Sequence, residues 1–401
     1  MRLSNSYFYT LRESSKDEDS LSGNLLVRSG MIKKSSSGIY MYLPFGYKVL
    51  KNIERIIREE MNKEGANELL MPVLIPEEIY VKSGRREIIG SSMFSLKDRY
   101  DRSYNLGPTH EELFAIAASM KIKSYKDMPF NIYQFETKFR DEARPRYGLI
   151  RVREFIMKDA YSFDKDLDGL DISYNKMYNA YKKCFDRMGL NYKIVKADTG
   201  IMGGLLSEEF QAVTDIGEDI LVLCDKCDYA SNIEVSKCVN NNLLNYEEEL
   251  EYELVETKDS KTIDEISKFL NTPSDKFVKT LIYNIDGKLY ALLVKGDDEV
   301  NEIKVQKLLN ANNVELADFE KVEKITNAEV GFAGPIGLDI DIIIDSEVLN
   351  MKNFIVGANK TDYHYKNVNL SNFKYTSSDI RNIKEGDICP LCGGKIYFKR
   401  G

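Results

Sequence analysis

Five arginines lie within one stretch of seventeen residues, "FRDEARPRYGLIRVREF", which runs from Phe139 to Phe155. They are Arg140, Arg144, Arg146, Arg151 and Arg153. A guanidinium group keeps its charge and offers two parallel N–H donors, which suits phosphate oxygens. Glu142 and Phe155 add a carboxylate acceptor and an aromatic face, the two groups that an adenine base uses. The stretch is therefore compatible with a nucleotide site and with a solvated basic hairpin, and its composition alone does not decide between them.

Four of the six cysteines form two CxxC pairs, Cys224 with Cys227 and Cys389 with Cys392. Two such pairs are typical of a structural zinc site with four thiolate ligands. Their separation is far longer than in an ordinary zinc ribbon. However, the pairs flank one unit of the sequence, whose entry and exit strands could bring them side by side. The sequence leaves two alternatives open, a zinc site or two metal-free knuckles. Cys184 and Cys238 are interpreted as structural.

Other candidate residues have a structural interpretation beside the functional one. Thr109 and Glu112 have the spacing of a capping box, which predicts a helix start. The histidines of the chain are His110 and His364, and a lone histidine is more often structural than catalytic. "DKDLDG" begins like an EF-hand loop, but Asn175 stands where the bidentate glutamate belongs, so calcium is not expected.

Length and composition limit the class of protein. A chain of 401 residues is long enough for two or three domains. With 56 basic and 64 acidic residues the net charge is −8, which argues against coating nucleic acid through bulk charge but permits a local basic groove. Apolar runs stay short of the roughly 20 residues that span a bilayer, and no signal-peptide core is found. A cytoplasmic location away from membranes, with reduced cysteines, is the prediction.

The apolar periodicity predicts a mixture of helices and strands. Helices are expected at 49–61, 173–190, 262–270 and 299–311, and the segment 103–120 is expected to form a strand, a turn and a helix. Strands are expected at 68–76, 130–142, 149–163 and in a hairpin at 281–294 that turns at Asp286 and Gly287. The polar, acidic stretch 240–262 is predicted to be a linker or an exposed edge. Together these elements give an α+β fold class.

Several motifs in order carry a family resemblance. "FRDE" followed by a loop and "RVREFIMKD" resembles motif 2 of the class II aminoacyl-tRNA synthetases. "YLPFGYKVL…ELLMPVLIP" resembles motif 1, "NLGPTHEE" the proline-binding loop, and "DKFVKTL" with "GANKTDYH" the editing insertion of the bacterial-type prolyl-tRNA synthetases. The resemblance covers essentially the whole chain. It implies an antiparallel class II sheet flanked by helices in residues 1–228, an inserted α/β editing domain in 229–385, and a return strand in 386–401.

The resemblance also implies residue roles in the synthetic site. Arg140 would hold the ATP α-phosphate and the substrate carboxylate, Glu142 would accept from the adenine amino group, and Arg151 would bind the outer phosphates. Phe155 would stack on adenine. Thr109 and Glu111, together with Arg140, would bind proline. ATP and Mg²⁺ are the implied cofactors. The pocket segment "MGGLLSEEF" departs from the family at Leu205 and Glu208, where serine and histidine are more usual.

An editing site is implied at Lys279, Asp345 and His364, with the "GFAGPIGL" loop shaping its pocket. A synthetic pocket cannot strongly reject alanine, which is smaller than proline, so a second hydrolytic site is needed. His364 is interpreted as a contact to the misacylated tRNA end rather than as a general base.

The implied function is that of a proline–tRNA ligase that binds proline, ATP and tRNA(Pro), edits Ala-tRNA(Pro) and dimerises through motif 1. The family pattern continues with motif 3 and an anticodon-binding domain, which this sequence lacks, so we expect an N-terminal portion with impaired adenylate formation. Two alternatives remain: a stand-alone Ala-tRNA(Pro) deacylase, and a non-catalytic paralogue that binds adenylate or tRNA.

Overall fold

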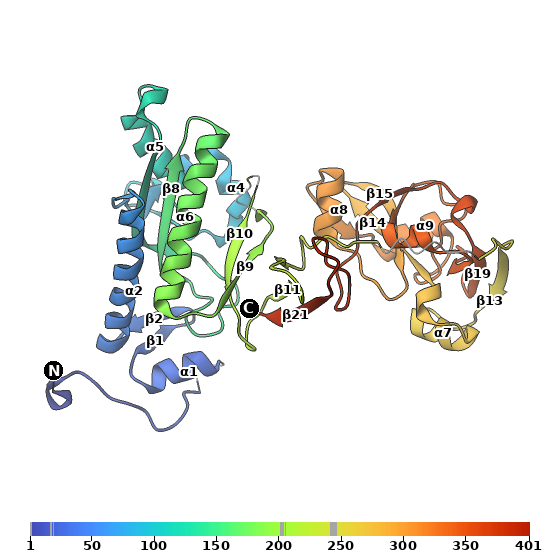
Figure 1. Ribbon diagram of the computed structural model, residues 1–401, viewed down its shortest axis with the longest axis horizontal. Coiled ribbons are helices and arrows are strands. Elements are labelled where there is room, and N and C mark those ends of the chain that lie inside the picture. The colour runs from blue at the N-terminus through green and yellow to red at the C-terminus, as the bar shows by residue number, and fades with distance from the viewer. Residues whose placement is uncertain (1, 17, 19, 201–203, 205, 241–246) are drawn as a thin grey trace. The chain divides into compact units, whose positions relative to one another are not determined.

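The computed structural model describes residues 2–16, 18, 20–200, 204, 206–240 and 247–401 (Figure 1). It divides into two compact units, a first unit Met1–Asn191 and a second unit Tyr192–Gly401. Both units combine helices with sheets whose strands are mostly antiparallel, so the predicted α+β class is confirmed. The domain boundaries after residues 228 and 385 stay predictions.

The first unit contains helices and three small sheets. Its helices are α1 (Leu21–Arg28), α2 (Pro44–Lys63), α3 (Glu77–Ser83), α4 (Arg85–Ile89), α5 (Glu111–Lys121) and α6 (Leu167–Met188). Its strands are β1 (Ile32–Ser36), β2 (Ile39–Tyr42), β3 (Asn67–Glu68), β4 (Leu74–Pro76), β5 (Ser95–Lys97), β6 (Ser103–Leu106), β7 (Phe130–Phe139) and β8 (Glu154–Phe163). The sheet orders are β1-β2, β4-β6-β5 and β3-β7-β8.

The ribbon of β7 and β8 organises this unit. The two strands pair antiparallel without a register shift, from Phe130 opposite Phe163 to Phe139 opposite Glu154. Helices α2 and α6 pack on each other and contribute to a core shared with the ribbon (Figure 1). That core consists of Met61, Ala66 and Tyr133, with Ile57, Phe135, Ala160, Met177 and Tyr181 against it. The paired strands predicted on either side of the arginine-rich loop are therefore confirmed.

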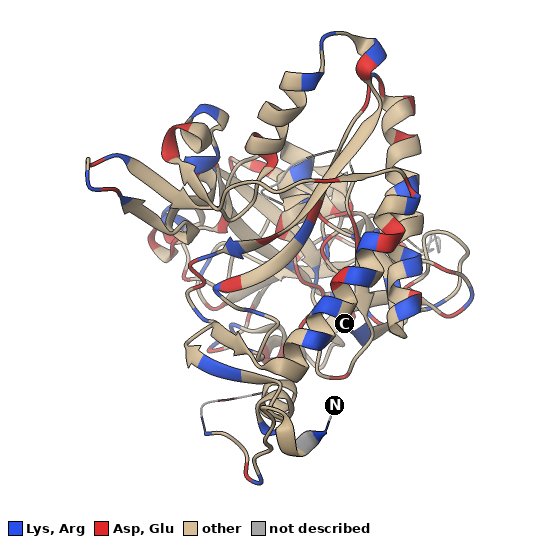
Figure 2. Cartoon of the chain, turned by 90° about the vertical axis from the view of Figure 1, so that its left-hand side faces the viewer, with Lys and Arg blue, Asp and Glu red and all other residues tan. Residues whose placement is uncertain are grey.

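The outer faces of the two helices carry charges of both signs. Arg187 on α6 reaches across to Glu60 and Glu59 on α2, with 2.5 Å between nitrogen and oxygen in each contact. Lys and Arg alternate with Asp and Glu along the helices in Figure 2. Arg187 and Glu59 are both partly exposed, so this ion pair contributes little to folding, whereas the Glu60 carboxylate is buried.

Two predicted elements of the first unit differ from the structure. The predicted strand at 68–76 is wrong: only the short β3 and β4 form there, and Leu70 between them is 71% exposed. Pro72 has no N–H to donate, and the N–H of Met71 binds the side chain of Gln134 instead of a neighbouring strand. The predicted helix at 49–61 is correct but begins earlier, at Pro44, where proline suits the first helical turn.

The second unit is built mainly from strands. They are β9 (Tyr192–Lys196), β10 (Glu208–Ala212), β11 (Ile220–Cys224), β12 (Ala230–Asn232), β13 (Glu253–Glu256), β14 (Val278–Ile285), β15 (Lys288–Lys295), β16 (Val314–Leu316), β17 (Asp341–Asp345), β18 (Phe354–Gly357), β19 (Tyr363–Val368), β20 (Thr376–Ser378) and β21 (Ile396–Arg400). Its helices are α7 (Ile263–Leu270), α8 (Glu302–Leu309) and α9 (Phe319–Thr326). The sheet orders are β10-β9-β12-β11-β21, β16-β14-β15-β17-β20 and β13-β19-β18.

The last strand of the chain returns to a strand that lies far earlier in the sequence. β21 pairs antiparallel with β11, from Ile220 opposite Arg400 to Cys224 opposite Ile396, and the two lie side by side in Figure 1. The intervening chain therefore leaves and re-enters this sheet at neighbouring strands.

The sheet β16-β14-β15-β17-β20 is the centre of that intervening chain. Asp286 and Gly287 both have positive φ, 47° and 87°, so β14 and β15 are joined by the predicted tight hairpin turn. Alternate residues of its strands belong to two different buried clusters, one on each face. The sheet β13-β19-β18 covers one of these faces through Phe354, Val356 and Val368. The stretch at 240–262, predicted to be a linker or an exposed edge, includes β13, a largely exposed strand at the edge of that sheet, whereas residues 241–246 lie outside the described residues.

The "GFAGPIGL" loop lies directly on β18. A Cβ atom added to Gly334 would lie 1.7 Å from the carbonyl oxygen of Gly357, so only glycine fits there. The Asn359 side chain fixes the approach, since it accepts from the N–H of Gly334 at 2.8 Å and donates to the carbonyl of Ile336 at 2.9 Å.

We expect Gly334→Ala to destabilise the second unit by about 3 kcal/mol, because the loop must move away from a rigid backbone carbonyl. Gly337→Ala in the same loop is the matched control. Its Cβ would meet open space, so it costs only the strain of a positive φ, about 1 kcal/mol. Urea unfolding of both variants measures the difference. Equal destabilisation would show that the close approach does not limit residue 334.

Candidate functional site

The arginine-rich stretch connects the ends of β7 and β8. The ladder extends one step beyond β7, where the N–H of Arg140 donates to the carbonyl of Arg153 at 3.0 Å. A further antiparallel bridge between Arg146 and Arg151 closes the loop. The predicted strand at 149–163 therefore becomes regular only at Glu154, and the residues before it form the loop.

Four predicted ATP-binding residues lie together at this end of the ribbon. The Arg140 guanidinium lies over the ring of Phe155, with its Cζ 5.4 Å from the ring centroid. Arg151 donates to the Glu142 carboxylate at 2.8 Å. The Arg151 and Glu142 side chains are 44% and 24% exposed, so solvent reaches this ion pair and its interaction energy is small. A nucleotide that used both groups would exchange one charged contact for another at little cost.

The predicted proline-binding residues lie at the start of α5. The hydroxyl of Thr109 donates to the carboxylate of Glu111, which also forms an ion pair with Arg85 at 2.7 Å. The predicted capping box is wrong: α5 begins at Glu111 with His110 at the N-cap, and the Glu112 carboxylate accepts from Ser83 instead. Helix α3 holds the loop before α5 in place, since the hydroxyl of Tyr80 donates to the Thr109 carbonyl at 2.7 Å.

A buried polar network supports this loop. The Lys138 ammonium is fully buried, 2.9 Å from the Asp159 carboxylate and 2.7 Å from Nδ1 of His110. Because an ammonium can only donate, Nδ1 accepts and the proton of His110 resides on Nε2, which donates to the carbonyl of Pro72 at 3.2 Å. Burial and the neighbouring Lys138 charge both lower the pKa of His110, so its ring is neutral.

The network joins the proline loop to the strands that carry the arginines. Asp159 also accepts from Tyr161 at 2.9 Å and from Gln134 at 3.1 Å. Sequence analysis did not single out Lys138 or Asp159. A signal was available, because charged residues in two largely apolar, paired strands favour a buried ion pair. The role found for His110 is structural, as expected for a lone histidine.

The two departures from the family pattern are placed only in part. Glu208 begins β10, opposite Lys196 of β9. Leu205 lies outside the described residues.

A separate cavity lies in the second unit, along the first half of β14. It encloses about 570 Å³. Polar and small residues line it among apolar ones, and those that bear on its chemistry are Lys261, Thr262, Lys279, Thr280, Gly331 and His364. Lys279 and His364, both predicted editing residues, thus border one cavity.

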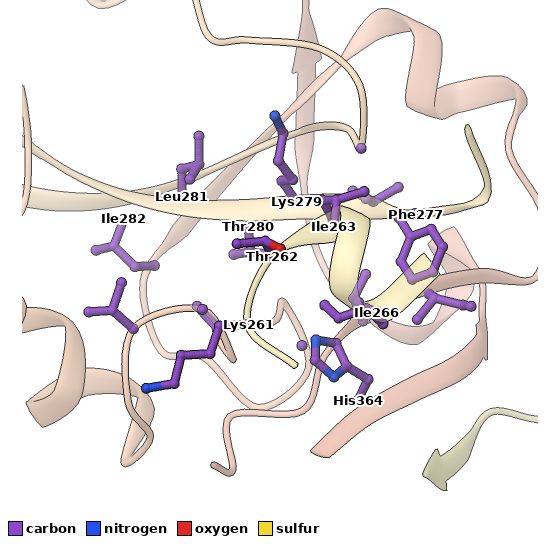
Figure 3. A pocket seen from close by; sticks show the side chains of 18 of the residues that line it. Lys261, Thr262, Ile263, Ile266, Phe277, Lys279, Thr280, Leu281, Ile282 and His364 are labelled. Atoms are coloured by element: carbon purple, nitrogen blue, oxygen red, sulfur yellow. The ribbon is translucent and has the colours of Figure 1, made fainter. Parts of the chain in front are cut away.

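The two residues do not face each other. Lys279 and Leu281 project to one side of β14, whereas Thr280 and Ile282 project to the other, toward the side on which His364 lies (Figure 3). Burial lowers the pKa of Lys279, with nearby carboxylates opposing the shift. The Thr280 hydroxyl is buried and has no hydrogen-bond partner in the described part of the chain. A buried donor of this kind is available to a ligand.

Asp345 does not belong to this cavity. It lies at the end of β17, where its carboxylate accepts from the N–H groups of Ile380 and Arg381 at 2.9 and 3.1 Å. It also lies 3.8 Å from the buried Arg381 guanidinium. The structure therefore gives this predicted editing residue a role in holding the segment after β20.

The four predicted metal ligands come together. The sulfur atoms of Cys224, Cys227, Cys389 and Cys392 all lie within 4.8 Å of one another. Cys184 is buried in α6, and Cys238 lies apart near Lys304 and Arg381.

Within the described ranges, no helix has the length and apolar content of a bilayer span.

Comparison with protein families identifies two matching regions. Residues 94–273 match the tRNA synthetase class II core domain (G, H, P, S and T). Residues 257–373 match the aminoacyl-tRNA editing domain, which includes both faces of the cavity described above.

Curated proteins match over the whole chain. A proline–tRNA ligase from Caldicellulosiruptor bescii is 53% identical over 403 residues, which cover 100% of this chain and 70% of that protein. A proline–tRNA ligase from Thermoanaerobacter sp. (strain X514) is 49% identical over 407 residues, covering 100% and 71%. Among solved structures, Giardia lamblia prolyl-tRNA synthetase in complex with prolyl-adenylate aligns with 48% of this chain and 41% of its own, at 22% identity and a TM-score of 0.44. At this TM-score the structural match is too distant to support an argument, so the family assignment rests on the sequence relatives.

The environment of His364 makes the stability of the second unit depend on pH. Burial lowers the pKa of His364 to about 4, and its Nδ1 lies 2.6 Å from the Thr257 hydroxyl. An unfolded histidine titrates near 6.5, so below that pH the unfolded chain binds a proton that the folded chain does not. The contribution of neutral, buried His364 to the unfolding free energy is fully present above about pH 6.5 and is lost as the pH falls toward 4.

Between pH 7 and 4.5 we expect wild type to lose about 2 kcal/mol more unfolding free energy than His364→Asn, which keeps a polar group beside Thr257. Hydrogen exchange of the β18 and β19 amides in urea follows the unit that contains the residue. Identical pH dependence in the two proteins would show that His364 titrates normally.

Proposed function

Because the chain belongs to the proline–tRNA ligase family, we propose that it activates proline with ATP and transfers the prolyl group to tRNA(Pro). The observation that carries the first step is the grouping of Arg140, Glu142, Arg151 and Phe155 at one end of the β7–β8 ribbon. The family match and this grouping concern the same residues, since the class II core region includes all four.

In activation, a carboxylate oxygen of proline attacks the α-phosphorus of ATP, a new O–P bond forms, and pyrophosphate leaves with the electrons of the broken bond. Such a step needs alignment and charge neutralisation rather than a protein nucleophile. Arg140 neutralises the α-phosphate and the incoming carboxylate. Arg151 leaves Glu142 for the outer phosphates, and Glu142 then accepts from the adenine amino group. ATP enters as its Mg²⁺ complex, the usual form of the nucleotide in phosphoryl chemistry.

Proline is held at the start of α5. Its secondary ammonium needs an anionic acceptor, which Glu111 supplies beside Thr109. Arg85 already pairs with Glu111 at 2.7 Å and fixes the position of the carboxylate. The buried Lys138 network fixes the loop that presents both residues, so proline and ATP are placed by one rigid framework.

We also propose that the cavity beside β14 hydrolyses Ala-tRNA(Pro). The alanyl end enters on the side of β14 toward which Thr280 projects and on which His364 of β19 lies. The Thr280 hydroxyl hydrogen bonds to it. Lys279 lies on the other side and contacts the anionic tRNA backbone at the entrance. A second sieve requires that the part of the cavity around the aminoacyl group admit the alanyl group and exclude the larger prolyl group.

The assembly that we propose is a cytoplasmic homodimer. Apolar side chains that are 36–49% exposed support the predicted dimer surface at β2 and the start of α2: Met41, Tyr42, Tyr47 and Val49.

The synthetic proposal predicts proline-dependent exchange of pyrophosphate into ATP. We expect Arg140→Ala to lower kcat/KM for this exchange by about 100-fold or more, as for removal of a donor to developing charge. Arg99→Ala is the control, since Arg99 is an exposed arginine in the turn between β5 and β6, and we expect it to stay within about twofold of wild type.

Binding of a non-reactive prolyl-adenylate analogue, measured by calorimetry, tests the same site without chemistry. Weaker binding in Arg140→Ala but not in Arg99→Ala supports the assignment. Equal binding in all three proteins, or exchange that does not depend on proline, would contradict it.

The editing proposal predicts hydrolysis of Ala-tRNA(Pro) but not of Pro-tRNA(Pro). We expect Lys279→Ala to slow this deacylation by about 10- to 100-fold, which corresponds to the roughly 1.5–3 kcal/mol of a hydrogen bond to a charged group. Lys288→Ala is the matched control, because Lys288 lies on the next strand in an exposed ion pair with Asp341.

Thr280→Val tests the other face of β14 with a side chain of similar shape. Slower deacylation by this variant, with unchanged pyrophosphate exchange, is the expected pattern. Deacylation that survives both Lys279→Ala and Thr280→Val would place editing elsewhere, and deacylation without any exchange would favour a stand-alone hydrolase.

A further inference from the structure

The four clustered cysteines come from two distant parts of the chain. Cys224 ends β11, and Cys227 follows it in a short knuckle. Cys389 and Cys392 form a second knuckle just before β21. Because β11 and β21 are neighbours, Cys224 lies opposite Ile396, and the two knuckles meet although Cys227 and Cys389 are 162 positions apart.

The distances between sulfur atoms match a tetrahedral metal centre. Sγ of Cys224 lies 3.4 Å from Sγ of Cys392, and Sγ of Cys227 lies 3.6 Å from Sγ of Cys389. A zinc ion with bonds of about 2.3 Å to four sulfurs requires sulfur–sulfur separations of about 3.8 Å. All pairs lie within 4.8 Å, so a small contraction of the widest ones suffices.

The backbone around the sulfurs favours thiolates over thiols. N–H groups donate to three of the four sulfur atoms, from Lys226 to Cys224 at 3.3 Å, from Leu391 to Cys389 at 3.5 Å and from Gly394 to Cys392 at 3.4 Å. These bonds place partial positive charge against sulfur, which offsets the charge of a Cys₄ site. A Cβ atom on Gly394 would lie 2.8 Å from Sγ of Cys224, so the second knuckle needs glycine to approach the first.

We propose that Cys224, Cys227, Cys389 and Cys392 bind one Zn²⁺ ion as a structural clasp. The clasp ties the segment that leaves the β11–β21 sheet to the segment that returns to it. A cross-link between such distant residues removes much conformational entropy from the unfolded chain, so metal binding stabilises the folded base of the second unit.

Two other states of the same cysteines make different predictions. Disulfides need a sulfur–sulfur distance near 2.05 Å, whereas all the cysteines here are free. Iron also accepts four tetrahedral thiolates, but it would colour the protein. Zinc is colourless and does not change its oxidation state, which suits a purely structural role.

The first experiment measures metal in the chain purified with a thiol reductant. Plasma mass spectrometry should find about one zinc per chain, and iron in its place would overturn the identity of the metal. The chelated protein should take up Co²⁺ with the intense visible bands of a tetrahedral thiolate site, which does not rely on any variant. Failure to bind zinc or cobalt would overturn the site.

Variants then assign the ligands. Cys392→Ser alters the exposed member of the cluster, so the fold is least disturbed, and we expect zinc to fall to less than about a tenth of its wild-type content. Cys184→Ser is the matched control and should retain zinc fully, since Cys184 lies in α6 away from the cluster. If the single variants Cys392→Ser and Cys389→Ser both retained all of their zinc, these cysteines would not be its ligands.

The clasp itself is tested by amide exchange with and without metal. Removal of zinc should speed exchange in β11 and β21 at least about tenfold and leave β7 and β8 unchanged. Unchanged exchange in β11 and β21 would show a bound ion that does not hold the two strands together, and would overturn the structural role.

Discussion

A chain that places a folded unit inside a sheet must bring both ends of that unit back to adjacent strands. The pairing of β11 with β21 meets this constraint, and the remainder of the second unit depends on it. The two cysteine knuckles can meet only because the pairing places Cys224 opposite Ile396. Further along, the buried Arg381 forms ion pairs with Glu347, 34 positions earlier, and with Asp387, 6 positions later, so charge as well as strand pairing holds the base of the unit.

In the first unit, one strand pair supports both loops of the proposed synthetic site. The far end of β7 and β8 carries the arginine loop, while Lys138 and Asp159 within the same strands hold the loop after β6. Removing either buried partner would leave an uncompensated charge, which is far more costly than losing a surface pair. The proposed proline-binding loop and the proposed nucleotide-binding loop are therefore both attached to the same strand pair.

The sequence predicts regular elements best where a local signal is strong. Alternating apolar residues predicted the β7–β8 pair, and Asp286 with Gly287 predicted a turn whose two positive φ angles they tolerate. Long-range contacts limited the rest. Thr109 has a capping-box partner in sequence, but its hydroxyl is used by Glu111, and α5 begins one residue later than the box requires. Likewise, the family resemblance implied an editing role for Asp345, yet its carboxylate accepts hydrogen bonds from the chain beyond β20. Neither contact is visible in a local pattern.

The buried position of Lys138 has a consequence for ionic strength. Salt screens charges through mobile ions in water, so it weakens pairs that water reaches and leaves dry pairs nearly intact. The contact of Arg187 with Glu59, between α6 and α2, belongs to the first kind, because the two side chains are 33% and 40% exposed. The contact of Lys138 with Asp159 belongs to the second. Concentrated salt would thus loosen the helical layer before it disturbed the support of the proline loop.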